Sequence, residues 1–165
     1  MVVDTRCALG RTAKIGDLYD IRNDTFTGKC LFTYDTLPTD IHTVFRDSTE
    51  DRVEYQGQLK NKLKGLQVED DLQLSTVAGL ARAEGDLRSL MCHQVSPTSG
   101  IMFRTVKTAI ERLVTPSHNI QKLFEMHGAN TGTATHVVVG ISWGGVAAVC
   151  IENKNSETQV DDMEK

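Results

Sequence analysis

The chain has 165 residues and a mass of 18.2 kDa, the size of one domain or of a piece of a larger protein. Its formal charge of −4 argues against a nucleic-acid binder, which needs a basic face, and against charge-driven binding to anionic membranes. No apolar run approaches the roughly 20 residues of a membrane-spanning helix. The first ten residues lack the hydrophobic stretch of a secretory signal, so we expect neither integral membrane helices nor ordinary secretion.

The first fifty residues indicate strands and turns. Residues 17–22 alternate between apolar and polar side chains, which predicts a half-buried strand. Turn-forming residues follow at Asn23, Asp24 and Gly28, and residues 29–34 predict a returning strand, after which Pro38 closes the segment.

The next segments favour helices. Residues 47–64 predict an exposed amphipathic helix that begins at Ser48 or Thr49 and ends at Gly65. Its few apolar positions fit one helix face: Val53, Leu59 and Leu63. Residues 72–80 start with strand alternation and become uniformly small and apolar, so a strand and a short buried helix both remain open.

The second half of the chain predicts two helices and then strands. Residues 105–113 place Val106, Ile110 and Leu113 at helical spacing, and Pro116 stops that helix. Residues 117–126 predict a short helix capped by Ser117 and ended by Gly128. The β-branched run at 135–143 and the apolar run at 146–151 predict strands. Strands, then helices, then strands indicate an α+β fold.

The chain end and the cysteines suggest no further site. Residues 151–165 hold five acids and two lysines, which supplies −3 of the net charge and predicts a solvated tail or the start of a charged helix. We therefore divide the chain into a domain at 1–150 and an acidic segment at 151–165. The four cysteines have no C-x-x-C spacing and are expected as buried free thiols. The dispersed histidines predict no metal site, and no cofactor-binding motif is present.

One motif has the form of a catalytic site. Gly-Ile-Ser-Trp-Gly at 140–144 follows a β-branched strand, as the nucleophile of an α/β-hydrolase does. In that fold the histidine follows the serine, whereas no histidine follows Ser142 here. His136 precedes it by six residues, roughly 20 Å along a strand and beyond hydrogen-bond reach. We therefore predict that the chain is not an enzyme, with a serine hydrolase as the third choice.

Three segments resemble one family when they are taken together. The N-terminal pattern Leu-Gly-Arg … Gly-x-Leu-Tyr-Asp resembles the opening of the perforin-like (MACPF/CDC-like) domain of stonustoxin- and verrucotoxin-type pore-forming toxins; its residues are Leu9, Gly10, Arg11, Gly16, Leu18, Tyr19 and Asp20. Residues 72–80 are similar to a Leu-x-Leu-Ser-x-Leu-Ala-Gly-Leu segment of that family. The wider perforin signature consists of Thr-His, a large apolar or aromatic residue, six further residues and then Gly-Gly. The corresponding residues here are Thr135, His136, Val137, Trp143, Gly144 and Gly145.

The resemblance implies a partial MACPF/CDC-like fold, with a twisted antiparallel sheet and flanking helices. Val137 replaces the aromatic residue of perforins, and residues 82–89 do not continue the family pattern. Family domains continue beyond the signature with a second helical cluster and a last strand, so the chain is expected to correspond to the front of such a domain. The Gly-Gly pair would permit a bend within strands or form a hairpin turn, and a positive φ is considered for Gly145. Trp143 is expected to be a core anchor rather than a membrane anchor.

Two function classes follow from this resemblance. The first is a non-enzymatic member of a pore-forming, cytolytic family that oligomerises on membranes and converts helical clusters into membrane hairpins. The second is a non-lytic module that binds other proteins. Expected partners are copies of the chain or related subunits and, in the full-length family, membrane lipid; nucleic acid is not expected. The expected location is cytoplasmic, or outside the cell by a leaderless route.

Overall fold

The computed structural model describes residues 3–32, 41–55, 58–94, 99–114, 117–128 and 133–152. Helices and antiparallel strands are mixed, which confirms the α+β prediction. The strands are β1 (Asp17–Asp20), β2 (Thr25–Cys30), β3 (Ile41–Tyr55), β4 (Ser99–Leu113), β5 (His136–Val137) and β6 (Gly140–Glu152). The helices are α1 (Leu59–Gly65), α2 (Asp70–Val77), α3 (Gly85–Cys92) and α4 (Ser117–Gly128).

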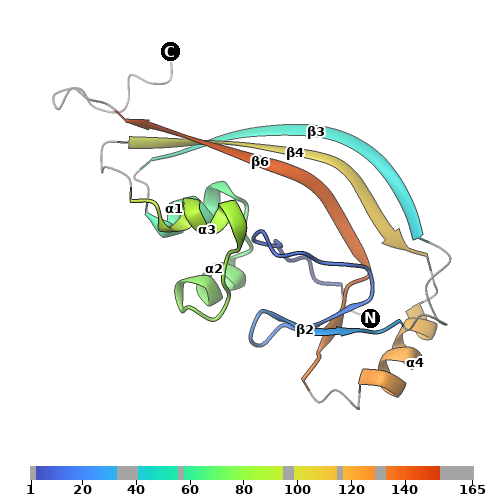
Figure 1. The fold of residues 1–165 in the computed structure, drawn as a ribbon. Helices are drawn as coiled ribbons and strands as arrows, with labels where there is room; N and C mark the ends of the chain where they lie inside the picture. Colours follow the sequence, from blue (N-terminus) through green and yellow to red (C-terminus); the bar gives the residue numbers. More distant parts are fainter. Residues whose placement is uncertain are drawn as a thin grey trace.

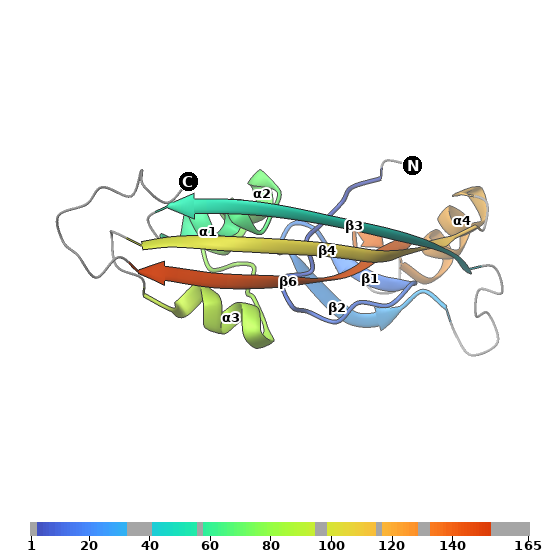
Figure 2. The same cartoon turned by 90° about the horizontal axis from the view of Figure 1, so that it is seen from above.

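A long, bent antiparallel sheet in the order β3-β4-β6 dominates the structure. The three strands form an arch, with α1, α2 and α3 under its concave side (Figure 1) and the strands side by side when seen from above (Figure 2). Register shifts lie between Phe45 and Ser48 in β3 and between Lys107 and Ala109 in β4. Bulges of this kind bend a strand, so the two shifts account for curvature at this part of the arch.

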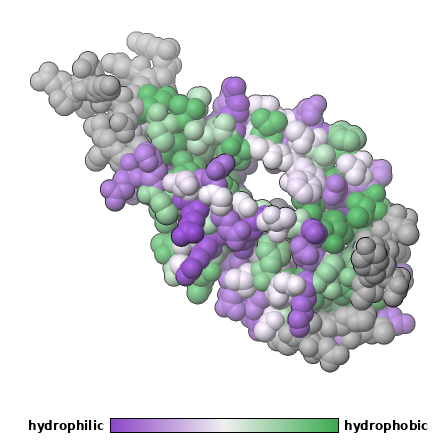
Figure 3. All heavy atoms as spheres, in the orientation of Figure 1, coloured by the Kyte–Doolittle hydropathy of each residue, from purple (hydrophilic) through white to green (hydrophobic). Residues whose placement is uncertain are grey.

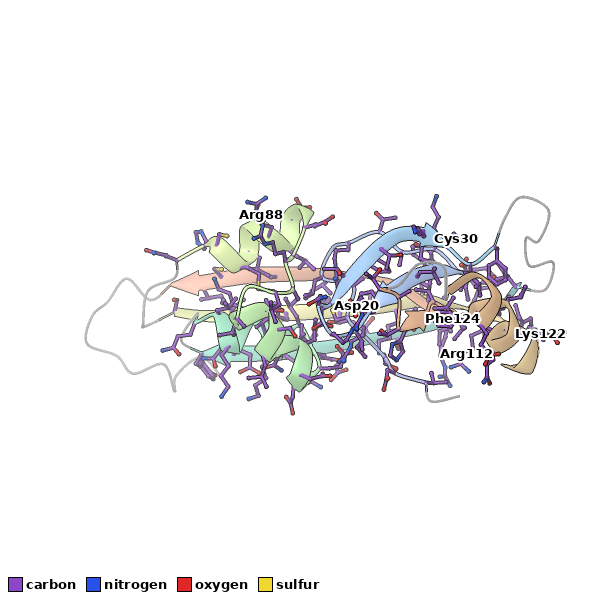
Figure 4. All side chains as sticks on the ribbon, turned by 90° about the horizontal axis from the view of Figure 1, so that it is seen from below. Asp20, Cys30, Arg88, Arg112, Lys122 and Phe124 are labelled. Carbon is purple, nitrogen blue, oxygen red and sulfur yellow. The ribbon has the colours of Figure 1, made fainter. Side chains whose placement is uncertain are left out.

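A second, small sheet in the order β2-β1-β5 lies beneath the other end of the arch, near α4. An opening remains under the arch in the space-filling view (Figure 3). In the view from below, Asp20 lies near the middle of the molecule, whereas Lys122 and Phe124 of α4 lie at one end (Figure 4).

Two separate hydrophobic clusters hold these parts together. The first joins α1 and α2 to the concave face of β4 and consists of Leu9, Leu63, Leu66, Val68, Leu72, Ala81, Ala83, Ile101 and Phe103. The second lies between the small sheet and α4 and consists of Leu18, Leu31, Phe32 and Ile120. Leu9 belongs to the helical cluster although it is close in sequence to β1, so the N-terminal segment links the two ends of the molecule.

Two predicted helices are wrong. Within residues 47–64, β3 runs to Tyr55 and only α1 is helical, because the charged side chains of this edge strand hide its alternation. Residues 105–113 belong to β4. There the bulge between Lys107 and Ala109 interrupts the two-residue period, so that apolar side chains recur at helix-like intervals.

Other element predictions are confirmed in whole or in part. The strand at 17–22 is β1, α4 covers the predicted helix to Gly128, and α1 ends at Gly65. Residues 72–77 belong to α2 and a turn follows, so of the two alternatives left open the helix is correct and the strand is wrong. The returning strand predicted at 29–34 overlaps β2 only at residues 29 and 30, and residues 33 and 34 lie outside the described part. Pro38 and Pro116 lie outside the described residues.

The C-terminal strands also differ from expectation. The run at 135–143 divides into β5 and the start of β6, and β6 continues through Gly144 and Gly145 to Glu152. The hairpin alternative for the glycine pair is therefore wrong. The proposed domain limit at residue 150 falls inside β6, and the division into 1–150 and 151–165 stays a prediction, since residues 153–165 are outside the described part.

The side chains of the cysteines and the lengths of the helices complete this picture. All four cysteines are free thiols, but Cys30, Cys92 and Cys150 are exposed, so their expected burial is wrong. None of the helices in the described part of the chain is long and apolar enough to cross a membrane.

Candidate functional site

The N-terminal motif and the Thr-His-Val signature meet in the small sheet. Leu18 pairs with Val137 and Tyr19 with His136 in the antiparallel ladder between β1 and β5. The backbone N–H of Val138 donates to the carbonyl of Asp17 over 2.9 Å. Two segments more than a hundred residues apart in the sequence therefore form one structural unit, which we name the motif junction.

Thr135 fixes the edge of the motif junction by hydrogen bonds from both its backbone and its side chain. Its N–H donates to the carbonyl of Tyr19 over 2.9 Å, and its Oγ1 accepts from the N–H of Ile21 at 2.9 Å. His136 lies with Nδ1 2.8 Å from this Oγ1 and Nε2 3.2 Å from Oδ2 of Asp4. The histidine thus connects the signature to the N-terminal segment by hydrogen bonds.

Arg11 and Tyr19 form a second layer of the motif junction. The Arg11 guanidinium lies 5.8 Å from the ring centre of Tyr19 and 5.5 Å from that of Phe26, within the range of cation–π contacts. It also donates to the backbone carbonyls of Ala8 and Asp24. The Tyr19 hydroxyl donates to Oδ1 of Asp24 over 3.0 Å, and burial raises the pKa of this phenol.

Asp20 organises the turn after β1. Its carboxylate accepts hydrogen bonds from the side chains of Arg22 and Asn23 and from the backbone N–H of Arg22. The Arg22 guanidinium holds the pKa of this carboxyl below its usual value. The same guanidinium donates to the carbonyl of Thr133 over 2.8 Å, so the turn is joined to the chain that leads into β5.

Two glycines of the N-terminal motif stand where a side chain cannot fit. Gly10 has φ +80°, and a Cβ there would overlap the carbonyl oxygen of Glu84 at the start of α3. Gly16 has φ +93°, and a Cβ would overlap the ring of Phe32. Positive φ and close approach both favour glycine. The backbone N–H of Glu84 donates to the carbonyl of Leu9 over 2.9 Å, which ties the motif to the helices.

The rest of the signature lies in β6, beside the bulge of β4. A Cβ on Gly144 would overlap the carbonyl oxygen of Val106, whereas one on Gly145 would meet no atom within 4 Å. Gly145 has no positive φ, so the constrained glycine of the pair is Gly144. Trp143 is exposed, and its expected role as a core anchor is wrong.

The structure gives Ser142 no catalytic environment. Ser142 lies within the continuous strand β6, opposite Ile110, and not on a strand-to-helix turn. Among the described residues, no hydrogen bond joins its hydroxyl to a histidine, and no three His, Cys, Asp or Glu side chains gather as a metal site would require.

Sequence reasoning missed the role of Lys62. In the sequence this lysine stands between Lys60 and Lys64, both of which are exposed, yet its own side chain is only 1% exposed. Its ammonium donates to the carbonyls of Leu90 at 2.8 Å, of Met91 and of His93, at the C-terminal end of α3. Burial lowers the pKa of this group. A positive charge at a helix C-terminus interacts favourably with the helix dipole. The sequence does not reveal this contact, because Lys62 and the end of α3 are brought together only by the fold.

Comparisons with known proteins agree with this geometry. A family model described as the SNTX, MACPF/CDC-like domain matches residues 3–165. Neoverrucotoxin subunit alpha of Synanceia verrucosa is 27% identical over 160 residues, which is 95% of this chain and 23% of that protein. The stonustoxin structure matches with a TM-score of 0.54 and 19% identity, over 87% of this chain and 18% of that chain. The chain therefore spans less than a quarter of the length of this curated relative.

Proposed function

Because the chain belongs to the SNTX, MACPF/CDC-like domain family, we propose that it acts as a non-enzymatic domain of the pore-forming toxin type, by oligomerising on membranes. The supporting observation is the position of α1, α2 and α3. These helices connect β3 and β4, which are antiparallel neighbours in the long sheet, and they lie under its concave side. If the segment that contains these helices changed from helix to strand, it would prolong both β3 and β4. Because these two strands are already paired, the prolonged strands would form a hairpin.

The second candidate is a non-lytic interaction module derived from the same domain. It is favoured by the polarity of the connecting helices, since a membrane hairpin needs one face that lipid can accept. In α1, Lys60 and Lys64 are exposed, and Lys62 is bound to the end of α3. These charges oppose insertion of this segment by the chain alone.

The proposal is tested by incubating the purified chain with liposomes, followed by chemical crosslinking and dye-release measurements. We expect oligomers that form on the membrane and no dye release by the chain alone, because the charged α1 segment would have to enter hydrocarbon. A chain that stays monomeric in the presence of liposomes would contradict the oligomerisation proposal. Dye release at sub-micromolar protein that heat denaturation abolishes would favour the lytic function over the interaction module.

The non-enzymatic part has its own test. Ser142→Ala should leave every measured function unchanged, because no described base reaches the hydroxyl of Ser142. Labelling of the parent by a fluorophosphonate probe, lost on this substitution, would restore the hydrolase interpretation.

A further inference from the structure

The N-terminal segment at residues 4–11 leaves the small sheet, reaches the helices under the arch and returns. Both of its ends are fixed at the motif junction: Oδ2 of Asp4 lies 3.2 Å from Nε2 of His136, and Arg11 donates to the backbone carbonyl of Asp24. In Figure 1 the blue N-terminal chain runs from the small sheet toward the helices. We name residues 4–11 the strap, because a segment that is anchored at both ends can hold the elements that its middle contacts.

The middle of the strap binds the start of α2. The backbone N–H of Cys7 donates over 2.9 Å to the carboxylate of Glu69, the residue that precedes this helix. The guanidinium of Arg6 forms an ion pair with Asp71 in the first turn of α2. Its Nε also lies 3.8 Å from Oδ1 of Asp24, in the turn between β1 and β2. Arg6 therefore bridges the small sheet and α2.

The next residues of the strap bind the start of α3. The carbonyl of Leu9 accepts a hydrogen bond of 2.9 Å from the N–H of Glu84, and the Leu9 side chain is buried in the helical cluster. The backbone turns here, with φ +52° at Leu9 and φ +80° at Gly10. Leucine rarely adopts a positive φ, and such a conformation persists only where its surroundings hold it. Detachment of the strap would therefore relieve strain at Leu9.

The helices α2 and α3 depend on contacts of this kind. Each has eight residues, whereas isolated helices shorter than roughly 12–15 residues are marginal in water. Leu72 is the one buried residue of α2, and α3 has none, in two ranges that the structure describes throughout. Leu74 and Val77 of α2 are exposed. Because little of either helix is buried, the strap at their starts and Lys62 at the end of α3 carry much of their attachment.

We propose that the strap is an autoinhibitory contact: it keeps α2 and α3 helical under the sheet, and its detachment frees the two helices together. This inference rests on the proposed function, in which the same segment changes from helix to strand. The docked strap is poised for release, since it holds Leu9 in a strained conformation. In the described part of the chain, the buried Nε of Arg6 also has no hydrogen-bond partner, which weakens docking further.

The test is amide hydrogen exchange of the whole chain in solution, followed by mass spectrometry. Asp71→Asn removes the charge that Arg6 binds and keeps the size of the side chain. We expect exchange to become about fivefold faster in both α2 and α3, and to stay unchanged in β1 and β5. The response of α3 is decisive, because the hydrogen bonds of Asp71 in the described part of the chain are to Arg6 and Leu72.

The matched control is Asp70→Asn, which removes the same charge from the same exposed first turn of α2. Both variants lose the same favourable interaction with the helix dipole, but Asp70 has no ion pair with Arg6. Asp70→Asn should leave the exchange of α3 at the parent's rate. Arg6→Gln should accelerate α3 as Asp71→Asn does, and the double variant should exchange no faster than Arg6→Gln alone.

Three results would overturn the strap. The first is unchanged exchange of α3 in both Asp71→Asn and Arg6→Gln, and the second is equal acceleration by Asp70→Asn and Asp71→Asn. The third is acceleration of β1 and β5 together with the helices, which would show a loss of global stability instead. Because exchange is measured without membranes, faster α2 and α3 in a chain that forms no oligomers on liposomes would support the strap while the proposed function failed.

Discussion

Asp20 is the residue at which acid should weaken the motif junction. Its pKa is held below the ordinary value of 3.8 by Arg22 in the folded chain. The carboxylate therefore stabilises the fold above that ordinary pKa, and this contribution is lost as the pH falls through the lower, folded pKa. We expect Asp20→Asn to lower the melting temperature at pH 6 and to differ progressively less from the parent toward pH 2.

The matched control for this titration is Asp86→Asn, at an exposed position in the first turn of α3. Its melting temperature should follow that of the parent across the same range. A gap between Asp20→Asn and the parent that stays constant down to pH 2 would mean that the Asp20 charge is not the cause.

The two signature glycines should respond differently to one added methyl group. Gly144→Ala places a Cβ against the carbonyl of Val106 and should destabilise the chain by about 1–3 kcal/mol, as overpacking does. Gly145→Ala meets open space and should be neutral or slightly stabilising, because alanine reduces the freedom of the unfolded chain. Chemical denaturation of both variants measures this difference, and equal losses would disprove a special role for Gly144.

At the scale of elements, Lys62 supplies a polar contact between α1 and the C-terminal end of α3. Lys62→Met keeps the apolar stem but leaves the carbonyls at the end of α3 without their ammonium donor, and we expect a loss of about 1–3 kcal/mol. Lys60→Met, on the same helix and exposed, should stay within about 0.5 kcal/mol of the parent. Urea denaturation compares the two, and similar midpoints would show that the contact contributes little.

The elements also show which parts of the fold a sequence can reveal. β1 was predictable because its buried apolar pair, Leu18 and Tyr19, stands between polar residues and is followed by turn-forming residues, and α4 because its end is marked by Gly128. β3 was not, since its helix-facing side carries charges that are satisfied by residues such as Lys64 and Gln67. β4 was not, because a bulge shifts its pattern. The site residues were found through resemblance, whereas the pairing of Tyr19 with His136 depends on the whole fold.

At the scale of the whole molecule, the two edges of the long sheet are unequal. Exposed strand edges invite pairing with other chains, and charged side chains discourage it. β3 presents six charged residues: Arg46, Asp47, Glu50, Asp51, Arg52 and Glu54. β6 presents none from residue 140 to residue 151, and in the described part of the chain its outer edge has no strand partner. Copies of the chain should therefore meet through β6 and not through β3.

This asymmetry predicts that the chain self-associates with increasing concentration and that one charge on β6 suppresses the association. Val149→Lys places the charge on β6, and Val53→Lys places it on β3 in the same cross-strand row, at a similarly exposed position. Sedimentation velocity should show weaker association for Val149→Lys than for Val53→Lys, which should resemble the parent. Because both substitutions add the same charge to the same face, equal behaviour of the two variants would mean that the β6 edge is not the contact. A parent that stays monomeric at every concentration would show that its open edge is protected by other means.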